Sequence, residues 1–406
     1  MSSAQIHGND EATNGYDVFL RNFITIIKMK ILNKFLALFS ILLLVTACNS
    51  STGFNQQGGG SSGGTPSTNT PALNGAINVY FSQPDSASAN TLKGGPETRL
   101  IAAIDQARIS VDVAIYELSL KNVTQSLIKA HQRDVRVRVL TDSDNFSWSQ
   151  IQELSRAGIA VKGDQRSALM HNKFTVIDKK QVWTGSMNYT TNAAYHHDEN
   201  LLQLDSIAAA TNYSEEFEQL WGGIHRQINA SASVFTVKNS TVQIYFSPDD
   251  HFRAQHLIPL LRSAQKSVHF MAFSFTSTDI TTALSNLKQQ GVEIKGVVDA
   301  GQAGSSYAQY KDLKNENIDV LLDGNSKKLH HKVMIIDNRY VVTGSYNFSQ
   351  SAETRNDENS VIVDNSNLAT RYEQEFKRVY QKAKSKKQRL PDISTLLNNL
   401  DLQIDY

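Results

Sequence analysis

Two segments of the chain carry the same reactive side chains at the same spacing. The first contains, in order, His171, Lys173, Asp178, Ser186 and Asn188. The second contains His330, Lys332, Asp337, Ser345 and Asn347. Each residue of the second set follows its counterpart by 330 − 171 = 159 positions. A constant offset of this size indicates a tandem duplication and not a short-period repeat.

An imidazole, an ammonium, a hydroxyl and an amide together suit the chemistry of a phosphate diester. Residues i and i+2 of an extended strand share a face, so His171 and Lys173 are expected to point to the same side. The lysines would hold the nonbridging oxygens of the phosphate together with four predicted phosphate-binding residues. These four residues are Ser186, Asn188, Ser345 and Asn347. One imidazole would attack phosphorus in its neutral form, and the other would protonate the leaving oxygen.

A carboxylate on the second nitrogen of each ring would fix the tautomer of that ring. Glu199 and Glu358 lie 28 residues after the histidines of their own copies and are the candidates for this position. No third and fourth ligand accompanies His171 or the pair His196-His197 at the regular spacing of a zinc site. We therefore expect neither a metal nor a cofactor, and we expect His196 at the surface.

The elements that position these residues repeat as well. Short β-prone runs are predicted at residues 110–115 and 267–272, each followed by a helix, at 122–131 and 278–290. Further strands are predicted at 135–140 and 292–298 and, around the motifs, at 174–177, 182–184, 333–336 and 341–343. Strands that alternate with helices predict an α/β fold with mixed sheets. Two such units would pack about a pseudo-two-fold axis and share one active site.

The paired motif resembles that of the phospholipase D superfamily, His-x-Lys-x4-Asp-x6-Gly-Ser-x-Asn in two copies, over about residues 73–382. The second copy, from His330 to Asn359, is similar to the compact bacterial endonuclease branch. The resemblance implies a phosphohistidine intermediate that water hydrolyses or an alcohol captures, without a metal. It also implies that Asp178 and Asp337 support the site more than they touch phosphorus. By analogy with two-motif lipases, His171 is the expected nucleophile and His330 the acid, although the symmetry permits the reverse.

The N-terminal region predicts export and anchoring. Residues 29–48 have a basic start, a short apolar core and a small residue before Cys48, which is typical of a secretory signal peptide. Val45 to Cys48 resembles a bacterial lipobox, so we expect an exported lipoprotein that faces the periplasm or the cell exterior. The predicted organisation is 1–48 upstream extension and signal peptide, 49–72 Gly/Ser/Thr-rich tether, 73–235 first unit, 236–382 second unit and 383–406 tail.

Composition narrows the function classes. Lys plus Arg is 40 and Asp plus Glu is 39, which argues against binding of nucleic acid or anionic lipid through bulk charge alone. Cys48 is the only cysteine, which excludes an internal disulfide framework. The expected activity is phosphodiester cleavage, by a monomer because both half-sites lie in one chain. A phospholipid, such as phosphatidylcholine or phosphatidylethanolamine, and a DNA or RNA diester remain alternative substrates. A transferase of the cardiolipin-synthase kind and a catalytically silent binding lipoprotein are weaker alternatives.

Overall fold

The computed structural model describes residues 77–231 and 233–389, here called the first half and the second half. The predicted signal peptide with Cys48 and the tether lie outside the described residues. So does the part of the predicted tail that follows residue 389. Within the described residues, no helix has the length and apolar character needed to cross a membrane.

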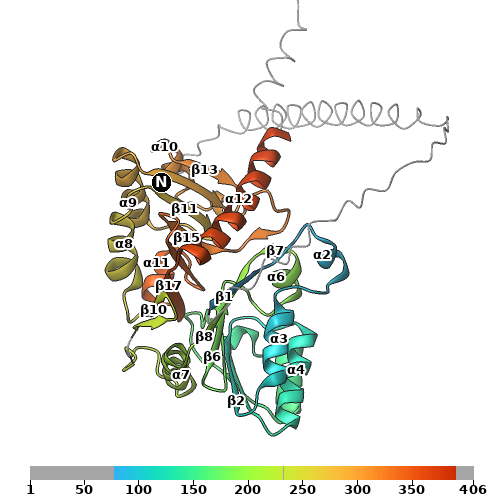
Figure 1. The fold of residues 1–406 in the computed structure, drawn as a ribbon. Coiled ribbons are helices and arrows are strands. Elements are labelled where there is room, and N and C mark those ends of the chain that lie inside the picture. The colour runs from blue at the N-terminus through green and yellow to red at the C-terminus, as the bar shows by residue number, and fades with distance from the viewer. Residues whose placement is uncertain (1–76, 232, 390–406) are drawn as a thin grey trace, which may run out of the picture. The chain divides into compact units, whose positions relative to one another are not determined.

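The first half forms a seven-stranded mixed sheet in the order β1-β8-β6-β5-β2-β3-β4 (Figure 1). Strands β2, β3 and β4 run parallel, and the other neighbours are antiparallel. The elements are β1 (Ile77–Phe81), α2 (Ala87–Thr91), α3 (Glu97–Gln106), β2 (Ser110–Ile115), α4 (Lys121–Gln132), β3 (Arg136–Thr141), η1 (Ser143–Asn145), α5 (Ser149–Arg156), β4 (Ala160–Gly163), β5 (Lys173–Ile177), β6 (Gln181–Gly185), α6 (Thr191–Tyr195), β7 (His197–Asp198), β8 (Asn200–Asp205) and α7 (Ile207–Trp221).

The second half repeats this plan in an eight-stranded sheet of order β13-β12-β11-β15-β16-β17-β10-β9. Its elements are β9 (Val234–Val237), β10 (Ser240–Ser247), η2 (Arg253–Leu257), α8 (Ile258–Arg262), β11 (Ser267–Ala272), α9 (Thr278–Gln289), β12 (Glu293–Val298), η3 (Gln302–Gly304), α10 (Tyr310–Asn315), β13 (Asp319–Leu322), β14 (Lys328–Leu329), β15 (Lys332–Ile336), β16 (Tyr340–Gly344), α11 (Gln350–Thr354), β17 (Glu358–Asp364) and α12 (Ser366–Arg389). The predicted α/β class with mixed sheets is confirmed.

Most of the predicted elements appear close to their predicted positions. Strands β2 and β11 have the bounds that the β-prone runs indicated, and all six residues of β2 are buried, as expected of a strand covered on both faces. Helix α9 stops just before Gly291, whose φ of 88° gives the left-handed conformation of a helix C′ residue. The division predicted between residues 235 and 236 falls inside β9, which pairs with β10 of the second sheet.

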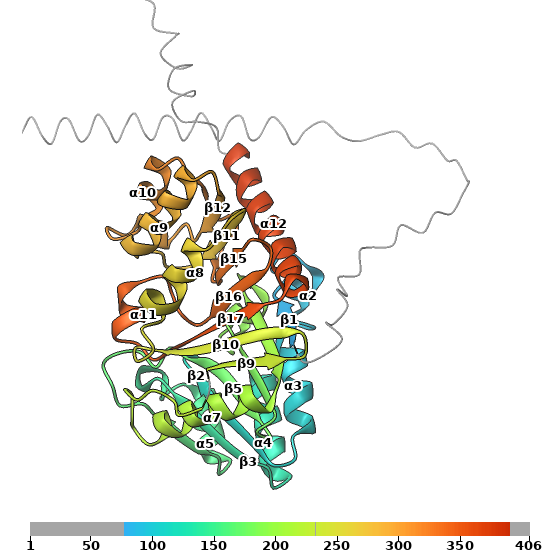
Figure 2. The same ribbon diagram turned by 60° about the vertical axis from the view of Figure 1, so that its left-hand side comes forward.

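The hydrophobic residues form three cores. One outer core lies under the helices of the first half and one under the helices of the second half. The third, central core joins residues of both sheets with the long helices α7 and α12. In Figure 2, β10 and β17 of the second half lie beside the strands of the first half. Because the central core draws on both halves, neither half buries its apolar surface without the other.

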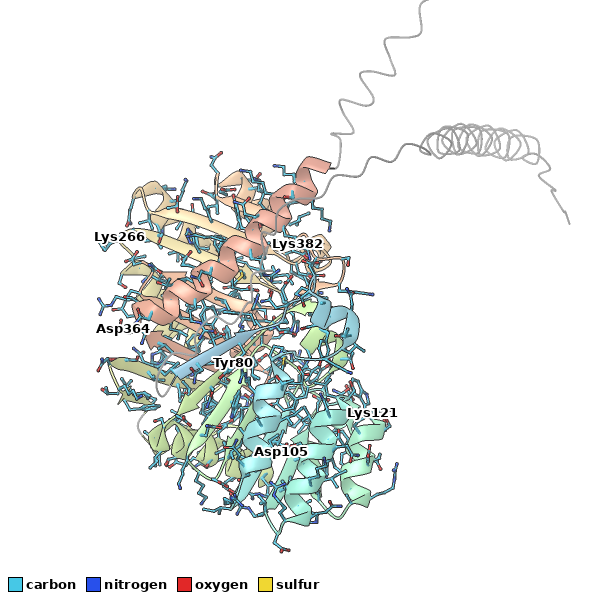
Figure 3. The ribbon with its side chains drawn as sticks, turned by 45° about the vertical axis from the view of Figure 1, so that its right-hand side comes forward. Tyr80, Asp105, Lys121, Lys266, Asp364 and Lys382 are labelled. Atoms are coloured by element: carbon cyan, nitrogen blue, oxygen red, sulfur yellow. The ribbon has the colours of Figure 1, made fainter. Side chains whose placement is uncertain are left out.

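Helix α12 reaches across to the first half. Figure 3 shows it beside β1, at the strand labelled by Tyr80. The guanidinium of Arg371 donates a hydrogen bond to the Val79 carbonyl oxygen at 2.7 Å, and the Lys382 ammonium lies 2.6 Å from Asp85 Oδ2. These contacts tie the last helix of the second half to the first strand of the first half and to the loop that follows this strand.

Candidate active site

Short backbone pairings between the halves set the register of the site. Strand β14 of the second half pairs in parallel with β7 of the first, and Met170 forms the equivalent bridge with Asp357. The His330 N–H donates to the Asp198 carbonyl oxygen and the His171 N–H to that of Asp357, each at 3.0 Å. The residue after each aspartate is therefore held next to a histidine of the other half.

The two histidine–glutamate pairs consequently cross between the halves. His171 Nδ1 lies 2.8 Å from Glu358 Oε2, and His330 Nδ1 lies 2.7 Å from Glu199 Oε1. Both glutamates are fully buried. The structure thus places a carboxylate on each ring, as the sequence predicted, but each carboxylate comes from the opposite copy. The equal spacing of 28 residues contains no information about this exchange.

The serines of the motifs do not lie where phosphate binding would require them. Ser186 and Ser345 are fully buried, and their hydroxyls donate to Glu199 Oε2 and Glu358 Oε2, each at 2.6 Å. Neither serine lines the cavity described below. The structure therefore places both hydroxyls behind the glutamates, in place of the predicted contact with the phosphate.

The motif aspartates lie at the far end of the hairpins that carry the motifs. Asp178 has a φ of 53°, and its carboxylate accepts the backbone N–H groups of Arg108, Ile109 and Ser110 at 2.7–3.1 Å. Asp337 caps the start of β11 in the same way. Asp178 and Asp337, which belong to the repeated set of reactive side chains, thus hold hairpin turns against neighbouring strands and do not line the cavity; this is a supporting position of the kind that the resemblance implies.

The motif glycines explain the close packing behind the site. Gly185 and Gly344 have φ values of 132° and 143°. A Cβ atom at Gly344 would lie 2.2 Å from the Asn359 carbonyl oxygen, and one at Gly185 would lie 2.5 Å from that of Asn200. Only glycine allows the strand this close approach.

The motif lysines lie just beneath the histidines. Lys173 and Lys332 are each 1% exposed, and their ammonium groups donate to the carbonyl oxygens of His171 and His330 at 2.6 and 2.7 Å. They do not line the cavity, and each faces an aromatic ring, Tyr116 or Phe273. Their positive charge acts on the site from this buried position, without the direct cavity exposure that the sequence suggested.

Both imidazoles open onto a single cavity of about 690 Å³, called here the reaction cavity. The amides of Asn188 and Asn347 also line it, in agreement with the positions predicted for them. Asn188 donates to Glu117 Oε2 at 2.9 Å, whereas Asn347 forms no side-chain hydrogen bond among the described residues. The geometry therefore brings together two histidines and two asparagines from the duplicated motifs around one space.

Sequence reasoning missed several residues of this wall. Tyr116 and Phe273 follow the central strands β2 and β11, and their rings lie 5.1 and 4.6 Å from those of His171 and His330. A signal was present, because the two aromatic residues occupy equivalent positions at the carboxyl ends of duplicated strands, where ligand sites of open α/β sheets lie.

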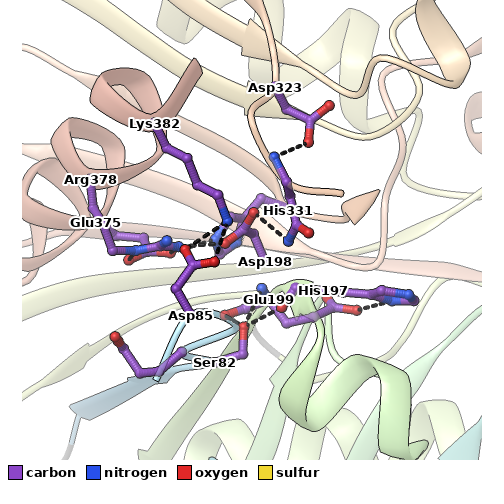
Figure 4. Close-up of polar contacts among 12 residues, drawn as sticks. Ser82, Asp85, His197, Asp198, Glu199, Asp323, His331, Glu375, Arg378 and Lys382 are labelled. Carbon is purple, nitrogen blue, oxygen red and sulfur yellow. Dashed lines mark hydrogen bonds and ion pairs between the residues drawn. The ribbon is translucent and has the colours of Figure 1, made fainter. Parts of the chain in front are cut away.

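The cavity is not symmetric in charge. Leu169 of the first half is matched at the offset of 159 by Lys328, and His197 is matched by Asn356. His197 Nδ1 lies 3.9 Å from Glu199 Oε1, whereas Asn356 donates to Glu358 at 3.3 Å (Figure 4 shows His197 beside Glu199). The His330 side of the cavity therefore carries more basic groups than the His171 side.

Burial sets the protonation of the substrate-free site. It lowers the pKa of His171 to about 4 and that of His330 to about 3, although Glu358 and Glu199 oppose the shift. Burial also opposes ionisation of the glutamates, but their histidine partners and the lysines outweigh it, so each glutamate pKa is lowered. Both imidazoles are therefore neutral near pH 7, with Nδ1–H donating to an ionised carboxylate and Nε2 left as an acceptor.

The lysines respond to the same burial. Burial lowers the pKa of Lys173 to about 8 and that of Lys332 to about 7, against the attraction of the two glutamates. Within residues 77–231 and 233–389, no group of three or more His, Cys, Asp or Glu side chains has the arrangement of a metal site. The polar groups present can attack, protonate and stabilise an anion.

Comparison with known proteins identifies the family of the chain. The profile of the family described as "Cardiolipin synthase, PLD-like domain" matches residues 100–221 and 257–380, one match in each half. The chain belongs to this family of phospholipase D-like proteins. It is 40% identical over 126 residues to a mitochondrial cardiolipin hydrolase of Xenopus laevis, which covers 30% of this chain and 60% of that protein.

Two further comparisons extend the relationship. A phospholipase D of Rickettsia prowazekii is 31% identical over 144 residues, covering 36% of this chain and 70% of that protein. The crystal structure of a phosphatidylserine synthase of Haemophilus influenzae has the same fold, with a TM-score of 0.56 at 14% identity, and the match covers 74% of this chain and 86% of that one.

Proposed function

We propose that the protein is a phospholipase D-type phosphodiesterase that hydrolyses phospholipids through a phosphohistidine intermediate, without a metal. One observation carries the proposal. The imidazoles of His171 and His330 open onto the same cavity, and each has a carboxylate of the opposite half on Nδ1. An oriented neutral imidazole is a competent nucleophile, and a second one beside the same phosphate is a competent acid and base.

The proposed reaction has two steps. In the first, the Nε2 lone pair of His171 forms a bond to phosphorus, and the P–O bond to the leaving alcohol breaks. His330, protonated once the anionic phosphate is bound, gives its Nε2 proton to the leaving oxygen. In the second, neutral His330 takes a proton from water as the water oxygen attacks phosphorus and the N–P bond breaks. Lys173 and Lys332 offset the charge that builds on the nonbridging oxygens.

A trapping experiment tests the order of the histidines. A diester with a p-nitrophenol leaving group needs no acid, so the His330→Asn variant is expected to form the covalent intermediate and to hydrolyse it slowly. The reaction is quenched in alkali, because phosphohistidine is stable there, and the modified residue is then located by peptide mapping. We expect the phosphoryl group on His171. A phosphoryl group on His330 in the His171→Asn variant, with none on His171 in the reverse variant, would contradict the assignment.

The names of the relatives support a lipid substrate. The Xenopus protein is named a cardiolipin hydrolase and the Rickettsia protein a phospholipase D. The match spans only 50–60% of the length of the vertebrate cardiolipin hydrolases, that of Xenopus included. Their names therefore support a lipid substrate for this chain as a proposal.

A second candidate activity is cleavage of single-stranded nucleic acid. Two observations favour it: Tyr307 at the cavity wall is 78% exposed, and Lys328 also lines the cavity. An exposed aromatic ring and a basic residue on the wall of one cavity are suited to base stacking and to phosphate binding. Parallel incubation with phospholipid vesicles and with single- and double-stranded DNA and RNA, each with and without EDTA, separates the two candidates. Loss of activity in EDTA, restored by zinc, would contradict the metal-independent mechanism.

We further propose that Cys48 carries a lipid that anchors the exported protein to a membrane. The support is the lipobox-like sequence from Val45 to Cys48 and the Gly/Ser-rich tether that follows it. The Cys48→Ser variant is expected in the soluble fraction after cell lysis. Membrane retention equal to that of the wild type would count against lipidation.

A further inference from the structure

The proposed mechanism leaves unused a third imidazole on the wall of the reaction cavity. His197 of β7 lines this cavity with a side chain that is 15% exposed, and its Nδ1 lies 3.9 Å from Glu199 Oε1 (Figure 4). The same carboxylate oxygen accepts from His330 Nδ1 at 2.7 Å. The ring centroids of His197 and His330 are 6.1 Å apart. Two imidazoles therefore face one carboxylate on this side of the cavity.

Contacts from both halves hold the backbone of His197. Its register partner in the parallel pairing of β7 with β14 is Lys328. The hydroxyl of Ser82, which follows the last residue of β1, donates to the His197 carbonyl oxygen at 2.6 Å. The carbonyl oxygen of the next residue, Asp198, accepts the His330 N–H at 3.0 Å. The backbones of the two histidines are thus held next to each other.

The other side of the cavity has no equivalent group. At the offset of 159, His197 corresponds to Asn356, whose side-chain nitrogen donates to Glu358 Oε1 at 3.3 Å. Among the residues that line the cavity, the His171 side therefore contains the motif imidazole alone, and the His330 side contains two imidazoles. The duplication does not explain this difference.

The in-line course of phosphoryl transfer gives the difference a chemical meaning. In the proposed mechanism the leaving oxygen departs opposite the attacking nitrogen of His171, which is the side of His330. In the second step His171 is the leaving group, so the attacking water must enter from that same side. His197 therefore lies on the side of the cavity from which the water attacks.

This side of the cavity can accept both hydrogens of a water molecule. With Nδ1–H turned toward the ionised carboxylate of Glu199, His197 and His330 each present Nε2 as an acceptor. Two nitrogens that share one oxygen at ordinary hydrogen-bond length are at most about 6 Å apart, so rings at the observed separation can both reach one water. An alcohol has a single O–H and leaves one acceptor without a donor, which costs free energy in a buried site.

Resting on the proposed function, we propose that His197 positions the attacking water and makes the protein prefer water to an alcohol as the acceptor. The water oxygen forms a bond to phosphorus, and the electron pair of the breaking N–P bond returns to His171 Nε2. One water proton passes to His330 Nε2. The other stays on the product oxygen and is hydrogen-bonded to His197 Nε2 during the attack. His197 is a positioning residue of the second step and has no role in the first.

The test follows the two steps separately with bis(p-nitrophenyl) phosphate in aqueous methanol. Single-turnover release of p-nitrophenol measures the first step, and phosphorus NMR measures the ratio of methyl ester to hydrolysis product. His197→Phe keeps a ring but no acceptor, so we expect an unchanged release rate and a ratio raised about tenfold, which corresponds to one lost hydrogen bond. His197→Gln keeps an acceptor at a similar reach and should restore the wild-type ratio. The neighbouring His196 does not line the cavity, and His196→Phe is the matched control.

Three results would overturn the proposal. One is an unchanged product ratio in His197→Phe. Another is a release rate that falls as far as the rate of hydrolysis, because His197 would then act in the first step or in folding. The third is a His197→Gln variant that behaves like His197→Phe, because an acceptor at this position would then have no effect. The proposed function fails separately: the wild type would then carry no phosphoryl group on a histidine after quenching in alkali.

Discussion

At the scale of single residues, the crossed histidine–glutamate pairs make each half dependent on the other. Glu358 of the second half orients His171, and Glu199 of the first half orients His330. A carboxylate that accepts from Nδ1–H leaves Nε2 free to attack or to carry the catalytic proton. Removing either carboxylate should therefore impair a histidine that lies about 130 to 190 positions away in the sequence.

We expect Glu358→Gln to lower kcat by roughly 100-fold or more, because an amide can donate to Nδ1 and stabilise the wrong tautomer. Covalent labelling by an activated diester should slow to the same extent if His171 is the nucleophile. Glu199→Gln should slow turnover of a lipid substrate but spare the labelling step of the activated diester, which needs no acid. Equal effects of the two variants on labelling would contradict the proposed roles.

The buried lysines predict the alkaline limb of the pH profile. With an activated diester, kcat/KM should fall as pH rises through about 7 to 8, because Lys332 and then Lys173 lose the positive charge that offsets the phosphate. The Lys332→Met variant should have a kcat/KM lower by roughly 100-fold at pH 6. Its kcat/KM should then fall only near pH 8, where Lys173 loses its charge. A profile that is flat from pH 6 to 9 in the wild type would contradict this account.

The sequence predicted the types of the site residues better than their roles. Histidines, asparagines and glutamates all lie at or behind the reaction cavity. Ser186 and Asp178 do not line the cavity, because each follows the last residue of a strand, β6 and β5 respectively, where strand alternation no longer sets the direction of a side chain. The contact between Arg166 and Arg355 was not predictable, because the two residues meet only through pairing between the halves.

At the scale of elements, the Gly-Ser turn after each motif hairpin fixes how closely two strands approach. We expect Gly344→Ala to destabilise the protein by about 1–3 kcal/mol, because the added Cβ would lie 2.2 Å from the Asn359 carbonyl oxygen and φ is 143°. Thermal unfolding measures the loss. Gly304→Ala is the matched control, since nothing lies within 4 Å of its added Cβ. Equal melting temperatures of the two variants would contradict the packing argument.

The local pattern of apolar residues was sufficient to predict the longer strands but not the two-residue strands. The β-prone runs at 110–115 and 267–272 became β2 and β11 because apolar residues dominate both, β-branched ones in β2 and a Val with a Phe and a Met in β11. Strands β7 and β14 have two residues each and no apolar alternation. They form because β7 of the first half and β14 of the second half pair with each other through their backbones. Local sequence patterns do not reveal such pairing between distant segments.

At the scale of the whole molecule, the two buried imidazoles should make the stability of the fold sensitive to acid. The pKa values of His171 and His330 are lowered to about 4 and about 3, so the unfolded chain binds more protons than the folded one between these values and about 6.5. The glutamates, whose pKa values are lowered too, act in the same direction at lower pH. The raised pKa values of buried carboxyl groups, among them Glu216 and Asp323, act in the opposite direction over the same range. The contribution of the imidazoles is therefore measured as a difference: from pH 6.5 to pH 4 the melting temperature of the wild type should fall further than that of the His171→Asn/His330→Asn variant. Equal changes in the two proteins would contradict the buried neutral imidazoles.

The shared central core predicts that the two halves unfold together. All three tryptophans, Trp148, Trp183 and Trp221, lie in the first half, so their fluorescence reports that half alone. Leu284 is fully buried in the outer core of the second half, and Leu284→Ala should cost about 2–5 kcal/mol. Because the central core couples the halves, the tryptophan transition should shift as far as the calorimetric one. The exposed Lys288→Ala on the same helix is the control, and a tryptophan transition that stays in place while a second, earlier heat peak appears would show that the halves are independent.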